Sequence, residues 1–293
     1  AIFLGSAVSI SIAFIFIYPI FKGSLGVDSW RGLAALGASW IGGSGNMAAM
    51  QDVMAVPEAD FGAALIVDTV VYSVWLAFLL ILTPFAAKFN KAMKANTSKL
   101  EAVAAATSAE IDIEKKKTLD FTSILTLLGL SLLVSALSQT IGPKIAFGDI
   151  FTGGTMTVLL VTAIGLVAAL SPLGKMAGIE EMSNVYLYVV IGLLASRAGL
   201  FDLLAAPMWL LAGILVMVIH VVLMLLFSKL FKWDLTMITT ASMASIGGAA
   251  SAPIVSSAYD PSYAGIGVLM GVLGAAVGNI FGLFIANIMK LFV

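Results

Sequence analysis

Three stretches of this chain, residues 70–85, 158–170 and 208–227, contain no charged side chain and are mostly apolar. Such runs are typical of helices that cross a bilayer, which need about twenty apolar residues. In lipid every backbone polar group must be satisfied within the structure, so only helices and closed barrels span it. The alternating pattern of barrel strands is absent. Only 11% of the residues are charged, against about 25% in soluble domains, and we therefore predict an all-α polytopic membrane protein.

The apolar residues fall into nine segments, at about residues 2–21, 32–56, 61–87, 121–137, 151–170, 185–196, 207–231, 235–257 and 263–291. A polar stretch, residues 88–120, separates the third segment from the fourth. We therefore expect a first helical repeat (1–87), a linker (88–120) and a second helical repeat (121–293). The chain begins without a methionine or a basic leader, which argues against a signal peptide. The expectation is that residues 1–87 are the C-terminal part of a repeat whose upstream helices are missing.

Two of the segments are interrupted by glycine. The first, residues 32–56, contains Gly42-Gly43-Ser44-Gly45, and the second, residues 235–257, contains Gly247-Gly248 about two hundred residues later. Each glycine costs about 1 kcal/mol of helix stability relative to alanine. A pair of glycine-interrupted segments at corresponding positions is the best sequence indication of a transporter binding site. We expect two structural repeats, each with one interrupted transmembrane helix.

The distribution of lysine and arginine predicts the orientation of the chain. If all nine segments cross, one side carries 13 of the 15 basic residues, including Lys22, Arg31, Lys290 and the seven of residues 88–120. If the short segment 185–196 does not cross, that side carries 11, still with Lys22 and Arg31. Either way the positive-inside rule places the loop 88–120 in the cytoplasm of a multi-pass cell-membrane protein. Only the second case lets the two interrupted segments run in opposite directions, as inverted repeats require.

The interrupted segments and the helices after them resemble a known family. Residues 38–49, 61–64 and 67–75, and in the second part residues 241–248 and 267–274, are similar to the YjcL-like membrane proteins, domain-of-unknown-function family 819. More distantly the chain resembles the superfamily of cation/proton antiporters and sodium–bile-acid symporters. That resemblance implies two inverted repeats, each with a broken helix. Ser44-Gly45-Asn46 is similar to the sodium-binding turn of the bile-acid branch, whereas Asn279 stands where family members commonly have threonine.

A cation site is predicted around the first interruption and the helix that follows. Asp68 lies in a long apolar helix, where a carboxylate costs about 2.5–3.5 kcal/mol at mid-bilayer and normally faces a cavity or a cation. Ser44, Gly45 and Asn46 offer hydroxyl, carbonyl and amide oxygens, the ligands that hard cations prefer, and Thr69 adds a further hydroxyl. The alternatives are an Asp68 solvated near the membrane surface and glycines that serve packing alone.

The solute is predicted to bind where the two interruptions meet, at Gly43, Ser245, Gly247, Gly248, Ser251 and Asn279. Gly43 precedes a half-helix whose free N–H groups would attract an anionic group. Helix packing is the alternative reading for the second interruption, which carries no charge. Asn279 lies on a helix with glycines at spacings of three or four, which suits close helix contact.

These features predict a secondary transporter of a small solute, coupled to Na⁺ or H⁺, with no other cofactor and no enzymatic activity. One alternative is a rhomboid-like intramembrane serine protease with Ser44 as nucleophile and His220 as base, although His220 has bulky neighbours and fits an interhelical hydrogen bond better. A non-transporting membrane sensor is the other. The chain has no cysteine and one histidine, which excludes ordinary transition-metal sites. The expected partners are the lipid bilayer, the solute and a second copy in a homodimer, and no nucleic acid.

Overall fold

Helices make up all the regular structure in the part of the chain that the structure describes. The computed structural model describes residues 1–96, 120–147, 152–179 and 206–293, and residues 181–183, 185, 186, 189 and 192 between them. Among these described residues, six helices are long and apolar enough to cross a membrane. The prediction of an all-α polytopic membrane protein is therefore confirmed. Most of segment 185–196, whose crossing the sequence left open, lies outside the described residues.

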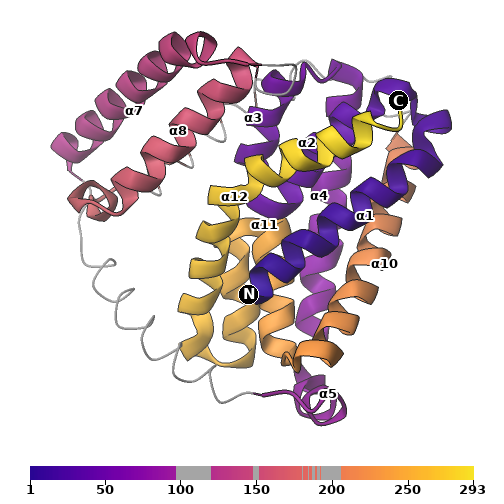
Figure 1. Ribbon diagram of the computed structural model, residues 1–293. Helices are drawn as coiled ribbons and strands as arrows, with labels where there is room; N and C mark the ends of the chain where they lie inside the picture. The colour runs from indigo at the N-terminus through magenta and orange to yellow at the C-terminus, as the bar shows by residue number, and fades with distance from the viewer. Residues whose placement is uncertain are drawn as a thin grey trace.

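The first interrupted segment is a hairpin. It comprises α2 (Trp30–Gly42) and α3 (Ser44–Met54), joined at Gly43, whose backbone has φ 92° and ψ 171°. An Nη1 atom of Arg31, at the start of α2, lies 3.4 Å from the carbonyl oxygen of Met54 at the end of α3. In a straight helix these residues would be about 34 Å apart. The segment enters the molecule, turns at Gly43 and returns to the end at which it started (Figure 1).

The second interrupted segment folds back in the same way. It is α11 (Leu235–Tyr259), whose helical path is broken at Gly248, with φ 64° and ψ −160°. The hydroxyl of Thr239 lies 3.1 Å from that of Tyr259, although a straight helix would separate these residues by about 30 Å. The prediction that each interrupted segment crosses the membrane once is therefore wrong, because each segment folds back at its glycine. Hydropathy reports how much apolar chain is present and does not report its direction.

The two hairpins enter from opposite ends of the molecule. The first opens at the end where Arg31 and Lys290 line one cavity, called here the Lys290 end. The second opens at the end that carries the short helix α5 (Ala86–Met93), because the backbone N–H of Leu235 donates to Asn90 there. Figure 1 shows α5 and the chain's C-terminus at opposite ends.

This arrangement corrects the expected distribution of basic residues. Lys22 bonds the carbonyl of Phe292 next to the C-terminus, and Arg31 and Lys290 share a cavity. All three therefore lie at the end opposite Lys88 and Lys91. The sequence placed Lys22 and Arg31 beside the central loop because it counted the first interrupted segment as one crossing.

Two units of the chain share the same order of elements. The first unit is α1 (Ile2–Leu25), the first hairpin and α4 (Glu58–Ile81), and the second is α10 (Ala206–Phe231), the second hairpin and α12 (Ala264–Lys290). The hairpins begin at residues 30 and 235, turn at Gly43 and Gly248, and end at residues 54 and 259. Each of these pairs is 205 positions apart. The units therefore match in spacing, and their hairpins enter from opposite ends.

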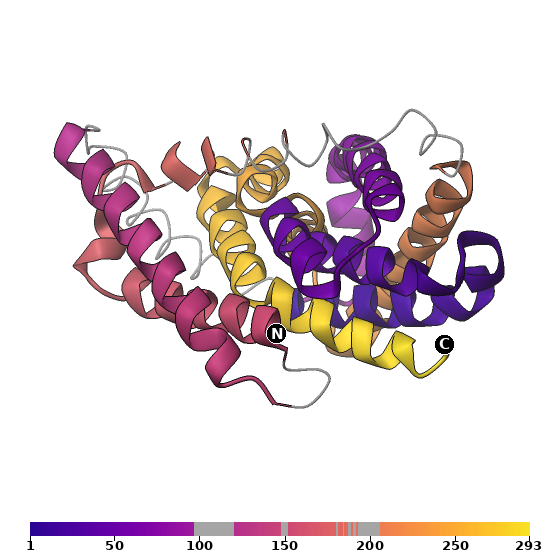
Figure 2. The same cartoon turned by 90° about the horizontal axis from the view of Figure 1, so that it is seen from above.

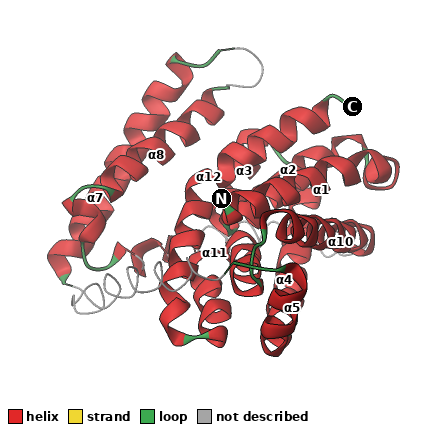
Figure 3. Ribbon diagram, turned by 60° about the horizontal axis from the view of Figure 1, so that its bottom comes forward, coloured by secondary structure: helices red, strands yellow, loops and turns green. Residues whose placement is uncertain are grey.

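Two further helices, α7 (Phe121–Ile141) and α8 (Gly153–Ala169), form an antiparallel pair at the side of the two units (Figures 2 and 3). Only α8 reaches the units closely, at α3 and α12. α7 is exposed along most of its length, as expected of a helix whose apolar side chains face lipid. The centre of the described structure is formed by the two hairpins and the helices α1, α4, α10 and α12.

Candidate functional site

The turns of the two hairpins meet against α12. A methyl group added at Gly274 would lie 2.6 Å from the carbonyl oxygen of Ile41 and 3.4 Å from that of Ala244. These carbonyls belong to different hairpins, and each lies within a few residues of its turn. One turn earlier in α12, a methyl group at Gly271 would overlap the backbone of Ala249. The glycines of α12 therefore let both turns approach its backbone, as small residues do in membrane interfaces.

The first turn holds its amide side chain close to the backbone. Asn46 is buried, and its Nδ2 donates to the carbonyl oxygen of Gly42 over 2.7 Å. Its side chain also fills the space that a methyl group at Gly278 of α12 would need. By contrast, a side-chain carbon added at Gly43 or at Gly248 would have no atom within 4 Å. Each turn therefore has open space beside its glycine.

Asp68 of α4 faces the first turn. It is 8% exposed, and its Oδ1 accepts a hydrogen bond from the hydroxyl of Ser39 over 3.0 Å. The side chains of Trp40 and Ser44 lie beside the same carboxylate, although the indole N–H of Trp40 has no hydrogen-bond partner. Within the described ranges the one salt bridge joins Arg31 to Asp28, so no basic side chain there pairs with Asp68. A buried carboxylate that lies among hydroxyl groups and has no basic partner can bind a cation or carry a proton.

Tyr72 extends the same face of α4 to the second turn. It lies one helical turn after Asp68, and its hydroxyl is 2.8 Å from that of Ser251. The ring of Tyr72 also covers Gly247, where an added methyl group would lie 2.8 Å from Cε2. One helix therefore touches both turns through side chains at positions i and i+4, which share a face. Tyr72 was not among the site residues predicted from the sequence, although its spacing of four residues from Asp68 places it on the same helix face.

The remaining predicted residues differ in their surroundings. Asn279 is 7% exposed and its Oδ1 has no hydrogen-bond partner, so this oxygen remains a candidate ligand. Ser245 points away from the turns, because its hydroxyl lies 2.8 Å from that of Ser6 on α1. Thr69 is exposed and its hydroxyl bonds the carbonyl of Leu65, so it does not join the group around Asp68. Gly45 is exposed beside the first turn.

His220 belongs to a separate buried network. It is 1% exposed; its Nδ1 lies 2.7 Å from the hydroxyl of Ser9 and its Nε2 lies 2.8 Å from that of Ser242. Trp75 donates to Ser242 as well, over 3.0 Å. The pattern accommodates a neutral imidazole protonated on Nδ1, a tautomer assigned from the hydrogen bonds. Both ring nitrogens are thus engaged away from Ser44, and the structure does not form the Ser44–His220 pair that a protease needs.

This network predicts a structural role for His220. Replacing His220 by leucine removes hydrogen bonds to two helices, α1 and α11, and such interhelical bonds contribute about 0.6–1.7 kcal/mol each in membrane proteins. We expect a lower free energy of unfolding and a lower melting temperature in detergent. Ser9→Ala, which removes one of the two bonds, should have about half the effect. If His220→Leu kept the melting temperature of the unmodified chain and lost ion-coupled transport, His220 would instead be a proton relay.

The chain matches one protein family over nearly its whole length. The family model described as "Protein of unknown function (DUF819)" matches residues 1–292. The chain belongs to this family. No curated protein and no solved structure matches the chain. Membership in DUF819 agrees with the resemblance found in the sequence, and the site around the two turns rests on its own geometry.

Proposed function

We propose that this DUF819 protein is a secondary active transporter of a small solute, coupled to Na⁺ or H⁺. The observation that carries the proposal is the meeting of two hairpin turns, from opposite ends, beside the buried carboxylate of Asp68. Two discontinuous helical segments that bring their ends to mid-membrane are the usual construction of a transporter site. The two units have the same order of elements, and their hairpins enter from opposite ends, as in inverted repeats. This arrangement supports the same interpretation, and with it the distant resemblance to the cation/proton antiporter and sodium–bile-acid symporter superfamily.

The coupling ion is proposed to bind on the Asp68 side of the first turn. Asp68 supplies a negative charge, Ser39 and Ser44 supply hydroxyl oxygens, and the end of α2 supplies backbone carbonyls. Oxygen donors of this kind suit a hard cation. With H⁺ as the coupling ion, the same carboxylate carries the proton, and Ser39 forms a hydrogen bond with it. Asn46 supports the turn by its bond to Gly42 and offers its amide oxygen.

The solute is proposed to bind in the space beside Gly43 and Gly248. The second helix of each hairpin begins there, so its first N–H groups point to the centre of the molecule and favour negative charge. Tyr72 and Ser251 would form one wall of this space. Transport then requires the hairpins to move relative to the other helices, so that the space opens alternately to the α5 end and to the Lys290 end. The basic loop 88–120 begins at α5, which makes the α5 end cytoplasmic under the positive-inside rule.

The proposal is tested with purified full-length chain in detergent and in proteoliposomes. Melting temperatures are measured in NaCl and KCl at equal ionic strength, at several pH values and with a metabolite panel. Stabilisation by Na⁺ or by protonation, followed by solute flux that depends on the same ion gradient, supports a transporter. Stabilisation by a ligand without flux would support a membrane sensor and not a transporter. Labelling of Ser44 by a fluorophosphonate would support the protease hypothesis.

A further inference from the structure

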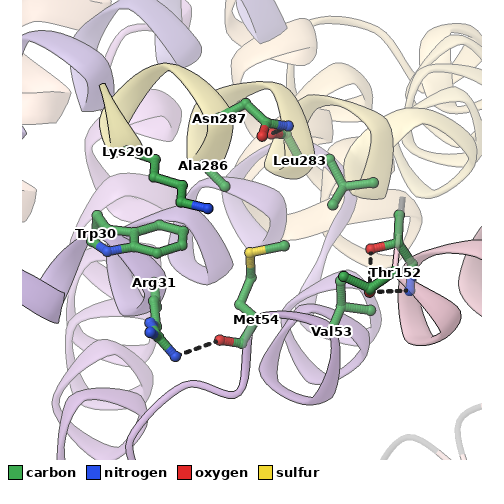
Figure 4. A pocket seen from close by; sticks show the side chains of 10 residues that line it. Trp30, Arg31, Val53, Met54, Thr152, Leu283, Ala286, Asn287 and Lys290 are labelled. Carbon is green, nitrogen blue, oxygen red and sulfur yellow. Dashed lines mark hydrogen bonds between the residues drawn. The ribbon is translucent and has the colours of Figure 1, made fainter. Parts of the chain in front are cut away.

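The cavity at the Lys290 end lies between the first hairpin and the last turns of α12. Its volume is about 190 Å³, room for about six water molecules at ~30 Å³ each. Its lining includes Trp30, Arg31, Met54, Thr152, Leu283 and Lys290. Its lining comes from α2, α3, α12 and the start of α8, so it lies where the α7–α8 pair meets the two units (Figure 4).

The cavity carries positive charge. Lys290 of α12 and Arg31 of α2 lie on either side of the Trp30 ring in Figure 4, and the Arg31 guanidinium carbon is 5.3 Å from the centre of that ring. None of the residues that line the cavity is acidic. Arg31 pairs with Asp28 at 3.4 Å, but the Nε atom of Arg31 is buried without a partner. Lys290 forms no ion pair with any described residue.

Two helix faces lead from this cavity to the hairpin turns. On α3, Met54 lines the cavity, and Met50 and Asn46 follow at intervals of four residues toward the turn. On α12, Leu283 lines the cavity and Asn279 lies one turn deeper, about 6 Å along the axis. Residues at this spacing share a helix face. Beneath the cavity therefore lie the fully buried Met50 and the unpartnered amide oxygen of Asn279.

We propose that this cavity is an outer binding site for a small oxyanion, a carboxylate or phosphate group, and that the transported solute carries such a group. Lysine and arginine hold these groups through charge-assisted hydrogen bonds, and guanidinium matches their planar geometry. The solute would dock on Lys290 and Arg31 and then pass along α3 and α12, with Met50 moving aside. The assignment of the solute rests on the proposed function, whereas anion binding in the cavity does not.

The test is an anion titration of the full chain in nanodiscs of phosphatidylcholine, at constant ionic strength in chloride. Inorganic phosphate and succinate are the probes, and binding is followed by calorimetry without any gradient. We expect saturable binding of at least one probe, weakened about tenfold or more by Lys290→Gln, because a hydrogen bond to a charged group contributes about 1.5–3 kcal/mol. Lys144→Gln, an exposed lysine at the same end that does not line the cavity, should bind as the unmodified chain does.

Three outcomes would overturn the proposal. The first is binding that Lys290→Gln leaves unchanged, and the second is no saturable binding of either probe. The third is a cavity that responds to phosphatidylglycerol added to the nanodiscs and to neither free anion, which would assign it to a lipid phosphate. Because the measurement needs no ion gradient, a transporter without an outer anion site and an anion site without transport give different results.

Discussion

We expect Asp68→Asn to abolish the response of the protein to its proposed coupling ion while the fold is retained. Asparagine keeps the size of the side chain and can still accept from Ser39, but it removes the negative charge that faces the first hairpin turn. An interaction with a charged group contributes about 1.5–3 kcal/mol, so we expect removal of the charge to lower ion affinity about tenfold to a hundredfold. Ion-dependent stabilisation and ion-coupled flux should both disappear.

Asp60→Asn is the matched control, because Asp60 lies on the same helix two turns nearer the Lys290 end and does not contact the turns. It should keep the ion response of the unmodified chain. The melting temperature of Asp68→Asn without added ion should equal or exceed that of the unmodified chain, since an uncompensated buried carboxylate is costly. Coupled flux at full rate in Asp68→Asn would remove Asp68 from the mechanism.

We expect Gly271→Ala to separate α12 from the second hairpin. The added methyl group would overlap the backbone of Ala249 and approach Gly248 to 2.7 Å, and backbone atoms cannot move aside as a flexible side chain can. Overpacking of this kind costs about 1–3 kcal/mol. We expect a lower melting temperature and loss of transport, because the second turn then no longer meets the first.

Gly129→Ala provides the comparison for this substitution. Gly129 lies in the exposed helix α7, where a methyl group would have no atom within 4 Å. Alanine there should be neutral or stabilising by up to about 1 kcal/mol, the difference in helix propensity. Equal melting temperatures for Gly271→Ala and Gly129→Ala would mean that α12 and the second hairpin are not packed as closely as the structure has them.

The helices themselves were largely predictable from the sequence. Apolar length gives the ends of α1, α10 and α12 to within a few residues, since a helix in lipid must be apolar over its span. The positions of both turns also follow from the sequence, because Gly43 and Gly248 adopt positive φ, which glycine accepts at little cost. The direction of the chain after each turn did not follow, because a hairpin and a crossing helix have the same composition.

The site was predictable only in part. Asp68 stood out because a carboxylate is rare in an apolar helix, and the structure places it against Ser39 and beside Ser44. Tyr72 was missed because a tyrosine in a membrane helix is ordinary until its partner, Ser251, is known. Ser245 and Thr69 were included for their hydroxyl groups, and only packing decides that these face α1 and the exterior. Which side of a helix faces a neighbour depends on tertiary contacts that hydropathy does not contain.

The proposed transport site requires that the two interrupted segments are hairpins that enter from opposite sides of the membrane. The chain has no cysteine, so single cysteines can be labelled with a membrane-impermeant maleimide in intact cells and in inverted vesicles. Val27→Cys and Ala59→Cys flank the first hairpin, and Lys229→Cys and Asp260→Cys flank the second. The structure predicts that the first pair reacts from one side only and the second pair from the other. If Val27→Cys and Ala59→Cys reacted from different sides, the first segment would cross the membrane and would not be a hairpin.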